Sequence, residues 1–141
     1  MLALLTGCAR IDPYLKQVKP LVRGDVPVIA GTLAGGPWLV EDINGGGVID
    51  NARLDLTFAD GRVSGRSGCN SYSGPWQESD GATLLGPIVS TQRGCAAALM
   101  MMEGKFIAVL EAARTVTFDE TGAAFLKAPD GRVIRIRREL R

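Results

Sequence analysis

The chain has 141 residues, 46% of them hydrophobic and 22% charged, and a formal net charge of +1. Its length fits one domain, and its charge balance provides no long-range field to attract nucleic acid or an anionic membrane. The sequence contains no histidine, which excludes Ser-His-Asp and Cys-His catalysis and imidazole metal ligands.

The first eight residues are interpreted as the remnant of a lipoprotein export signal. Residues 5–8, Leu-Thr-Gly-Cys, follow an apolar stretch and resemble a bacterial lipobox, whose cysteine carries diacylglycerol. No basic residue precedes Cys8, so two interpretations remain open: the true start lies upstream of Met1, or the match arises by chance. The first interpretation predicts a membrane anchor on Cys8 without a transmembrane helix.

Residues 9–32 are expected to be a tether and lead-in to the folded domain, which is assigned to residues 33–141. Pro13, Pro20 and Pro27 recur in the lead-in, and proline discourages helix. The first strand is predicted at residues 38–43, followed by a Gly-rich turn at residues 44–47.

Alternating apolar and polar side chains predict a half-buried strand at residues 53–58. We expect Leu54, Leu56 and Phe58 on its inner face, and Arg53, Asp55 and Thr57 on its outer face. Asp-Gly pairs at residues 60–61 and 80–81 predict hairpin turns. Further strands are predicted at residues 63–67, 72–77, 83–85 and 88–90.

One helix is predicted at residues 96–113, because apolar residues recur there at steps of three and four. Its apolar stripe comprises Leu99, Met102, Phe106, Val109, Leu110 and Ala113. The run of three methionines at 100–102 is interpreted as core and flank, since successive helix residues point about 100° apart and cannot meet on one copper ion. Gly104 is expected to let the helix approach a strand closely.

Strands follow the helix at residues 115–118, 123–127 and 133–137. In the last of these, Ile134 and Ile136 are expected to face the core while Arg135 and Arg137 face outward. The basic C-terminus is interpreted as a solvated strand face, with contact to anionic lipid as the alternative. Many strands with one helix indicate an α+β domain with a mostly antiparallel sheet.

Four spaced motifs resemble the META/HslJ domain family over residues 33–139. They are Trp38, the segment 68–74 (Gly-Cys-Asn-Ser-Tyr-Ser-Gly), the segment 91–95 (Thr-Gln-Arg-Gly-Cys), and the segment 103–106 (Glu-Gly-Lys-Phe). The resemblance implies a curved antiparallel sheet, a meander or partly closed barrel, packed on one helix. It also implies an envelope protein, lipid-anchored and facing the periplasm, associated with stress response and tolerance to antibiotics such as novobiocin. It supplies no catalytic residues.

Cys69 and Cys95 remain as a pair once Cys8 is assigned to lipid. In an oxidising envelope they are expected to form a disulfide, and the alternative is two buried reduced thiols. Two cysteines without histidine do not supply the four ligands of a zinc site.

Five polar residues are expected to gather near these cysteines: Asn70, Tyr72, Thr91, Arg93 and Glu103. They either form a pocket that orients a small ligand, or Asn70 satisfies backbone groups of its own loop. Glu103 either faces a cavity, or caps strand backbone groups or pairs with an arginine.

These observations predict a non-enzymatic interaction or scaffold module of the cell envelope. The alternative is a module that binds a small molecule or lipid near the Gly-Cys-Asn loop. We expect no cofactor, no metal and no nucleic-acid partner. An envelope protein or small ligand is the expected partner, and the sequence indicates no oligomeric state.

Overall fold

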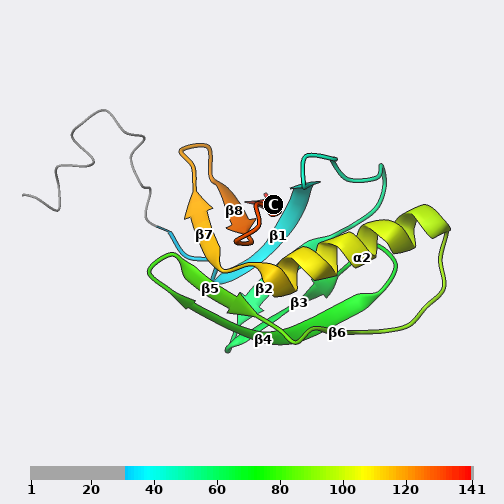
Figure 1. Cartoon of the computed structure of the whole chain (residues 1–141), viewed down its shortest axis with the longest axis horizontal. Helices are drawn as coiled ribbons and strands as arrows, with labels where there is room; N and C mark the ends of the chain where they lie inside the picture. The colour runs from blue at the N-terminus through cyan, green and yellow to red at the C-terminus, as the bar shows by residue number, and fades with distance from the viewer. Residues whose placement is uncertain (1–30, 141) are drawn as a thin grey trace, which may run out of the picture.

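A computed structural model describes residues 31–140 of the chain, so Cys8 and nearly all of the lead-in lie outside the described residues. The described part contains nine strands and one helix (Figure 1). They are, in chain order, β1 (Gly35–Ile43), β2 (Asp55–Ala59), β3 (Arg62–Arg66), β4 (Ser71–Ser79), β5 (Ala82–Leu85), β6 (Val89–Ser90), α2 (Ala97–Ala112), β7 (Thr115–Phe118), β8 (Ala123–Lys127) and β9 (Val133–Arg138).

All of these strands belong to one antiparallel sheet, in the order β3-β2-β1-β9-β8-β7-β5-β4-β6. The sheet curves into a ring, because β4 pairs with β3 along one edge and with β5 and β6 along the other. The expected α+β architecture, a curved and partly closed antiparallel sheet with one packed helix, is therefore confirmed. Within residues 31–140, no helix has the length and apolarity needed to cross a bilayer.

The ring closes between β5 and β7 through a narrow seam. Only Ala82 and Thr115 pair there in register. Two further main-chain hydrogen bonds hold the seam, from Thr83 N to Arg114 O at 2.9 Å and from Val116 N to Gly81 O at 2.8 Å. Helix α2 links β6 to β7 and packs against β5, β8 and β9, so it lies beside this seam.

The two predicted Asp-Gly hairpin turns form as expected. Asp60 and Gly61 have φ angles of 54° and 74°, and Asp80 and Gly81 have φ angles of 48° and 84°. Positive φ at both central residues matches the right-handed twist of the flanking strands. These turns join β2 to β3 and β4 to β5.

The core lies between the inner face of the ring and α2. The inner residues of β2 and β9, such as Leu56 and Ile136, are fully buried, and so are Phe106 and Leu110 of the helix. Leu99, at the start of the apolar stripe, is only partly buried. The spacing of apolar residues, every second residue in the strands and about every 3.6 residues in the helix, therefore identified the faces that pack together.

The outward arginines of β9 share one carboxylate. Arg135 Nε and Arg137 Nε lie 3.1 and 2.8 Å from the two oxygens of Glu41 in β1. The hydrogen bond from Arg137 is the main cause that lowers the pKa of Glu41 below its usual value. Ile134 and Ile136 face inward, so the expected alternation of this strand is confirmed.

Asp55 departs from the expected pattern, because it is 7% exposed rather than solvated. Its Oδ1 accepts a hydrogen bond from Arg66 N at 2.9 Å, and its Oδ2 pairs with Arg53 Nε at 2.6 Å. Gly65 makes this possible, since a Cβ there would overlap the Asp55 backbone carbonyl. The alternation of apolar and polar residues does not reveal that the Asp55 side chain folds back over Gly65 and becomes buried.

The expectation for Gly104 is wrong. Gly104 lies on the exposed face of α2, and a Cβ at this position would meet no atom within 4 Å. No neighbouring strand requires a glycine there, so the residue only weakens the helix.

Replacing Gly104 with alanine should raise the free energy of unfolding by about 1 kcal/mol, because alanine loses less backbone entropy in a helix. Urea unfolding monitored by circular dichroism measures the change. Gly65→Ala is the matched control and should lower stability through its overlap with Asp55. If Gly104→Ala lowered the stability instead, the small size of Gly104 would be needed for packing.

Candidate functional site

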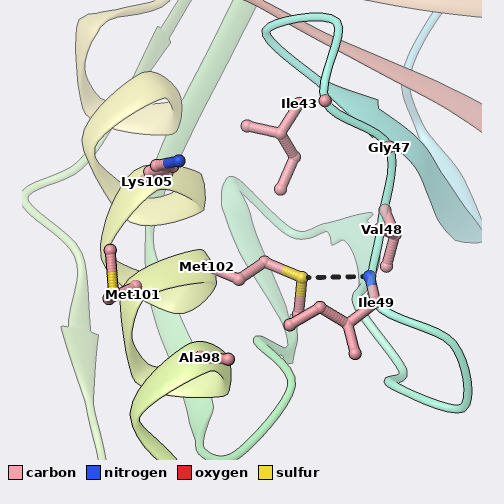
Figure 2. Close-up of a pocket in the computed structure, with 9 residues that line it drawn as sticks. Ile43, Gly47, Val48, Ile49, Ala98, Met101, Met102 and Lys105 are labelled. Carbon is pink, nitrogen blue, oxygen red and sulfur yellow. Dashed lines mark hydrogen bonds between the residues drawn. The ribbon is translucent and has the colours of Figure 1, made fainter.

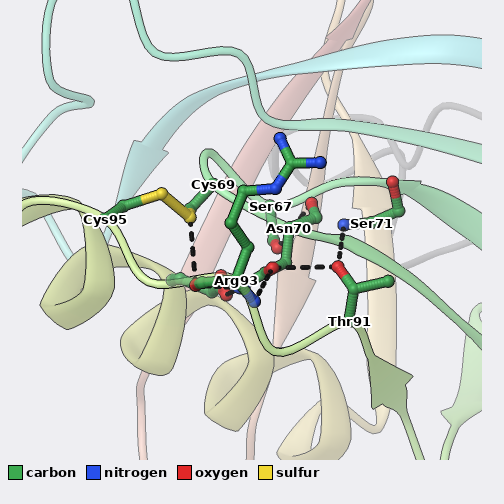
Figure 3. The surroundings of a disulfide bond; sticks show 8 residues. Ser67, Cys69, Asn70, Ser71, Thr91, Arg93 and Cys95 are labelled. Carbon is green, nitrogen blue, oxygen red and sulfur yellow. Dashed lines mark hydrogen bonds between the residues drawn. A yellow bond between two sulfur atoms is a disulfide. The ribbon is translucent and has the colours of Figure 1, made fainter.

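A disulfide joins Cys69 to Cys95, with the two Cα atoms 6.2 Å apart (Figure 3). Cys69 lies in the loop between β3 and β4, and Cys95 lies just before α2. The bond therefore fixes the start of the helix against the corner of the sheet. Of the two alternatives for this pair, the structure contains the disulfide.

The side-chain oxygen of Asn70 binds the segment that leads into the helix. Its Oδ1 accepts a hydrogen bond from Arg93 N at 2.7 Å and another from Thr91 Oγ1 at 2.9 Å. Thr91 Oγ1 in turn accepts a hydrogen bond from Ser71 N at 3.1 Å. Figure 3 shows these contacts side by side with the disulfide. The loop and this crossover are thus held together by a covalent bond and a polar cluster.

The side-chain nitrogen of Asn70 reaches the helix. Its Nδ2 donates to both carboxylate oxygens of Glu103, at 2.8 and 2.9 Å. Asn70 and Glu103 are 6% and 9% exposed, and a buried hydrogen bond to a charged group is stronger than one in water. Glu103 therefore binds an amide, and neither strand backbone nor an arginine.

Within the loop, Ser67 binds the main-chain oxygen of Asn70. Ser67 N and Ser67 Oγ donate to the main-chain oxygen of Asn70 at 2.8 and 3.0 Å. The Asn70 side chain is thereby free to join segments outside its loop. The expectation that this side chain serves its own loop is wrong, because it binds the crossover and the helix instead.

Tyr72 and Arg93 contribute differently from the other three candidates. Tyr72 is buried beneath the cluster, where its hydroxyl donates to Asp55 O at 2.7 Å and its ring meets Phe106 edge-on. Burial, with a smaller contribution from the charge of Asp55, raises the pKa of Tyr72 well above its usual value. Arg93 takes part through its main chain, and its side chain is exposed.

A groove of about 430 Å³ lies beside the cluster, between the crossover and α2. It is lined by Asn70, Arg93 and Glu103 together with Ser90, Gln92, Gly94, Met100, Gly104, Ile107, Ala108 and Glu111. The polar atoms of Asn70 that border it are bound to Arg93, Thr91 and Glu103. Glu111 likewise accepts a hydrogen bond from Ile88 N at 2.8 Å. This arrangement uses its polar groups to join segments, and it orients no nucleophile toward a base.

Within residues 31–140, no three cysteine, aspartate or glutamate side chains gather in a way that could hold a metal ion. Sequence reasoning missed a second groove, between the Gly-rich loop after β1 and the first half of α2. The signal was present as a glycine run at 45–47 and methionines at 100–102. Neither signal showed that the two segments face each other.

Reduction of the disulfide should lower the free energy of unfolding by about 3 kcal/mol, because the unfolded chain regains the entropy of a loop spanning 26 positions. Urea unfolding with and without dithiothreitol measures the loss. The double variant Cys69→Ala/Cys95→Ala should match the reduced protein and respond no further to reductant. Equal stability in both redox states would contradict a stabilising role.

Asn70→Asp should lower the free energy of unfolding by about 3 kcal/mol at pH 7, because it removes a donor and places a second carboxylate against Glu103. The loss should shrink as pH falls and one carboxyl takes up a proton. The double variant Asn70→Asp/Glu103→Gln should recover much of the stability, since the glutamine amide donates to the new carboxylate. Urea unfolding at two pH values tests this prediction. If the double variant were no more stable than Asn70→Asp, direct coupling between residues 70 and 103 would be contradicted.

Comparison with known proteins agrees with this architecture. A solved NMR structure of a protein from Burkholderia xenovorans is similar with a TM-score of 0.64 and 20% identity, covering 84% of this chain and 98% of that one. A second NMR structure has a TM-score of 0.59 and 20% identity, covering 75% of this chain and 94% of the other. No curated protein matches the sequence. The model of the META domain family matches residues 31–139, and the chain therefore belongs to the META domain family.

Proposed function

We propose that this chain is a non-enzymatic module of the bacterial cell envelope, anchored by lipid on Cys8 and engaged in protein interactions during stress. The observation that carries the proposal is the disulfide between Cys69 and Cys95. Disulfides persist in oxidising compartments such as the periplasm and are rare in the cytosol. The lipobox resemblance of residues 5–8 supports the same compartment independently.

The use of the polar residues in holding the fold supports the non-enzymatic part of this proposal. Asn70, Thr91 and Glu103 bind one another and the crossover backbone, so they are committed to holding the fold. A glycosidase requires two carboxylates across a bond, whereas Glu103 is bound by an amide and Glu111 by a main-chain nitrogen. The chain has no histidine to act as a base near neutral pH.

Binding of a small molecule beside the Gly-Cys-Asn loop is the second candidate function. The groove of about 430 Å³ at Asn70 and Arg93 favours it, since its volume lies in the range of small-ligand sites, roughly 300–1,000 Å³. The exposed guanidinium of Arg93 would be its main recognition group. We rank it below the interaction role because the other polar groups there already have partners.

The envelope proposal is tested with the full-length gene product in a bacterial host. Radiolabelled palmitate should be incorporated, globomycin should block processing, and Cys8→Ser should abolish the label. Alkylation of the native protein should leave Cys69 and Cys95 unmodified until reductant is added. An unlabelled cytoplasmic product with two free thiols would overturn the proposal.

A further inference from the structure

The second groove, between the Gly-rich loop and α2, is a candidate binding site that the sequence did not indicate. It has a volume of about 330 Å³, and its lining includes Val48 and Ile49 of the loop and Ala98, Met101, Met102 and Lys105 of the helix (Figure 2). Ala98 and Lys105 lie at opposite ends of it along the helix, about 10 Å apart by the helix rise. Its lining side chains are apolar except for Lys105 at one end, and the loop glycines contribute backbone.

The loop that forms one wall is held in place by its own hydrogen bonds. The carboxylate of Asp42 accepts from Gly45 N at 2.6 Å and from Gly47 N at 2.8 Å. Across the groove, Ile49 N donates to Met102 Sδ at 3.5 Å, which joins the loop to the helix. A site held in this way needs little ordering when a ligand binds, so less of the binding free energy is lost.

The groove presents apolar surface to solvent. Ile49 and Met101 are 40% and 65% exposed. Methionine side chains adapt to irregular apolar ligands because they are unbranched and polarisable. An apolar chain entering the groove would remove this surface from water, which is the main source of affinity for such ligands.

Lys105 gives the groove its polarity. It is exposed, and it forms no salt bridge with the acidic residues of the described chain. The Asp42 carboxylate, in the strand that leads into the loop, is occupied by the loop amides. An ammonium with three donors therefore stands at the end of an apolar groove without a carboxylate.

We infer that this groove binds a monomeric single-chain amphiphile with a carboxylate head, such as a fatty acid. The alkyl chain lies over Met102, between the loop and Met101, and the carboxylate pairs with Lys105. Charge complementarity favours an anionic head over a cationic or neutral one. The site depends neither on Cys8 nor on the groove at Asn70, so it stands or falls separately from the proposed function.

Titration of the ¹⁵N-labelled protein with dodecanoate, below its critical micelle concentration, tests this inference by NMR. Amide shifts should change at residues 43–49 and 98–105 and stay constant around Asn70. Lys105→Glu should weaken dodecanoate binding about fivefold or more and strengthen dodecyltrimethylammonium binding, because the charge at the groove end is reversed. Lys105→Met should remove the preference for dodecanoate over dodecanol while retaining apolar binding.

Lys127→Glu, on β8, is the matched control, since Lys127 lies over Phe125 and not in the groove. It should leave dodecanoate affinity unchanged. Ala98→Phe is a second variant, at an exposed helix position, and should weaken all three ligands by filling the groove. Absence of binding, shifts confined to other surfaces, or equal dodecanoate affinity in Lys105→Glu and wild type would each overturn the inference.

Discussion

The Asn70 side chain joins three segments that lie apart in the sequence. Its oxygen binds the crossover at Thr91 and Arg93, and its nitrogen binds Glu103 on the helix. The adjacent disulfide joins the same loop to the residue just before the helix. A covalent bond fixes how far apart the segments are, while the amide fixes their orientation through directed donors and an acceptor. The position of α2 over the core depends on this corner.

The arrangement also explains how a carboxylate is tolerated on a buried helix face. Glu103 is 9% exposed, and a buried charge is costly unless hydrogen bonds compensate it. Asn70 supplies that compensation, and its other hydrogen bonds hold it in place. The disulfide and the Asn70–Glu103 hydrogen bonds join the same loop to the start and the first half of the helix, so each interaction supports the other.

Local rules identified most of the fold. The Asp-Gly turns, the alternation in β2 and β9 and the stripe of α2 follow from backbone conformation and side-chain period, which are encoded within a few residues. The pairing of Cys69 with Cys95 was predicted because these two cysteines remain once Cys8 is assigned to the lipid anchor. The sequence did not predict the partners of Asn70 and Glu103 or the burial of Asp55. These features depend on which distant segments the ring brings together. Gly104 was misjudged for the same reason, since only the three-dimensional structure shows that nothing packs against it.

The narrow seam between β5 and β7 has a consequence for motion. Elsewhere neighbouring strands such as β8 and β9 pair over five residues, whereas this junction has one registered pair. Regions with few backbone hydrogen bonds open at lower free energy than the rest of a domain. Local opening of the ring should therefore begin at the β5–β7 junction, and it would expose the edge of β7 to solvent. The disulfide and Asn70 hold the start of α2 against the loop between β3 and β4, so opening of the seam would leave this corner intact.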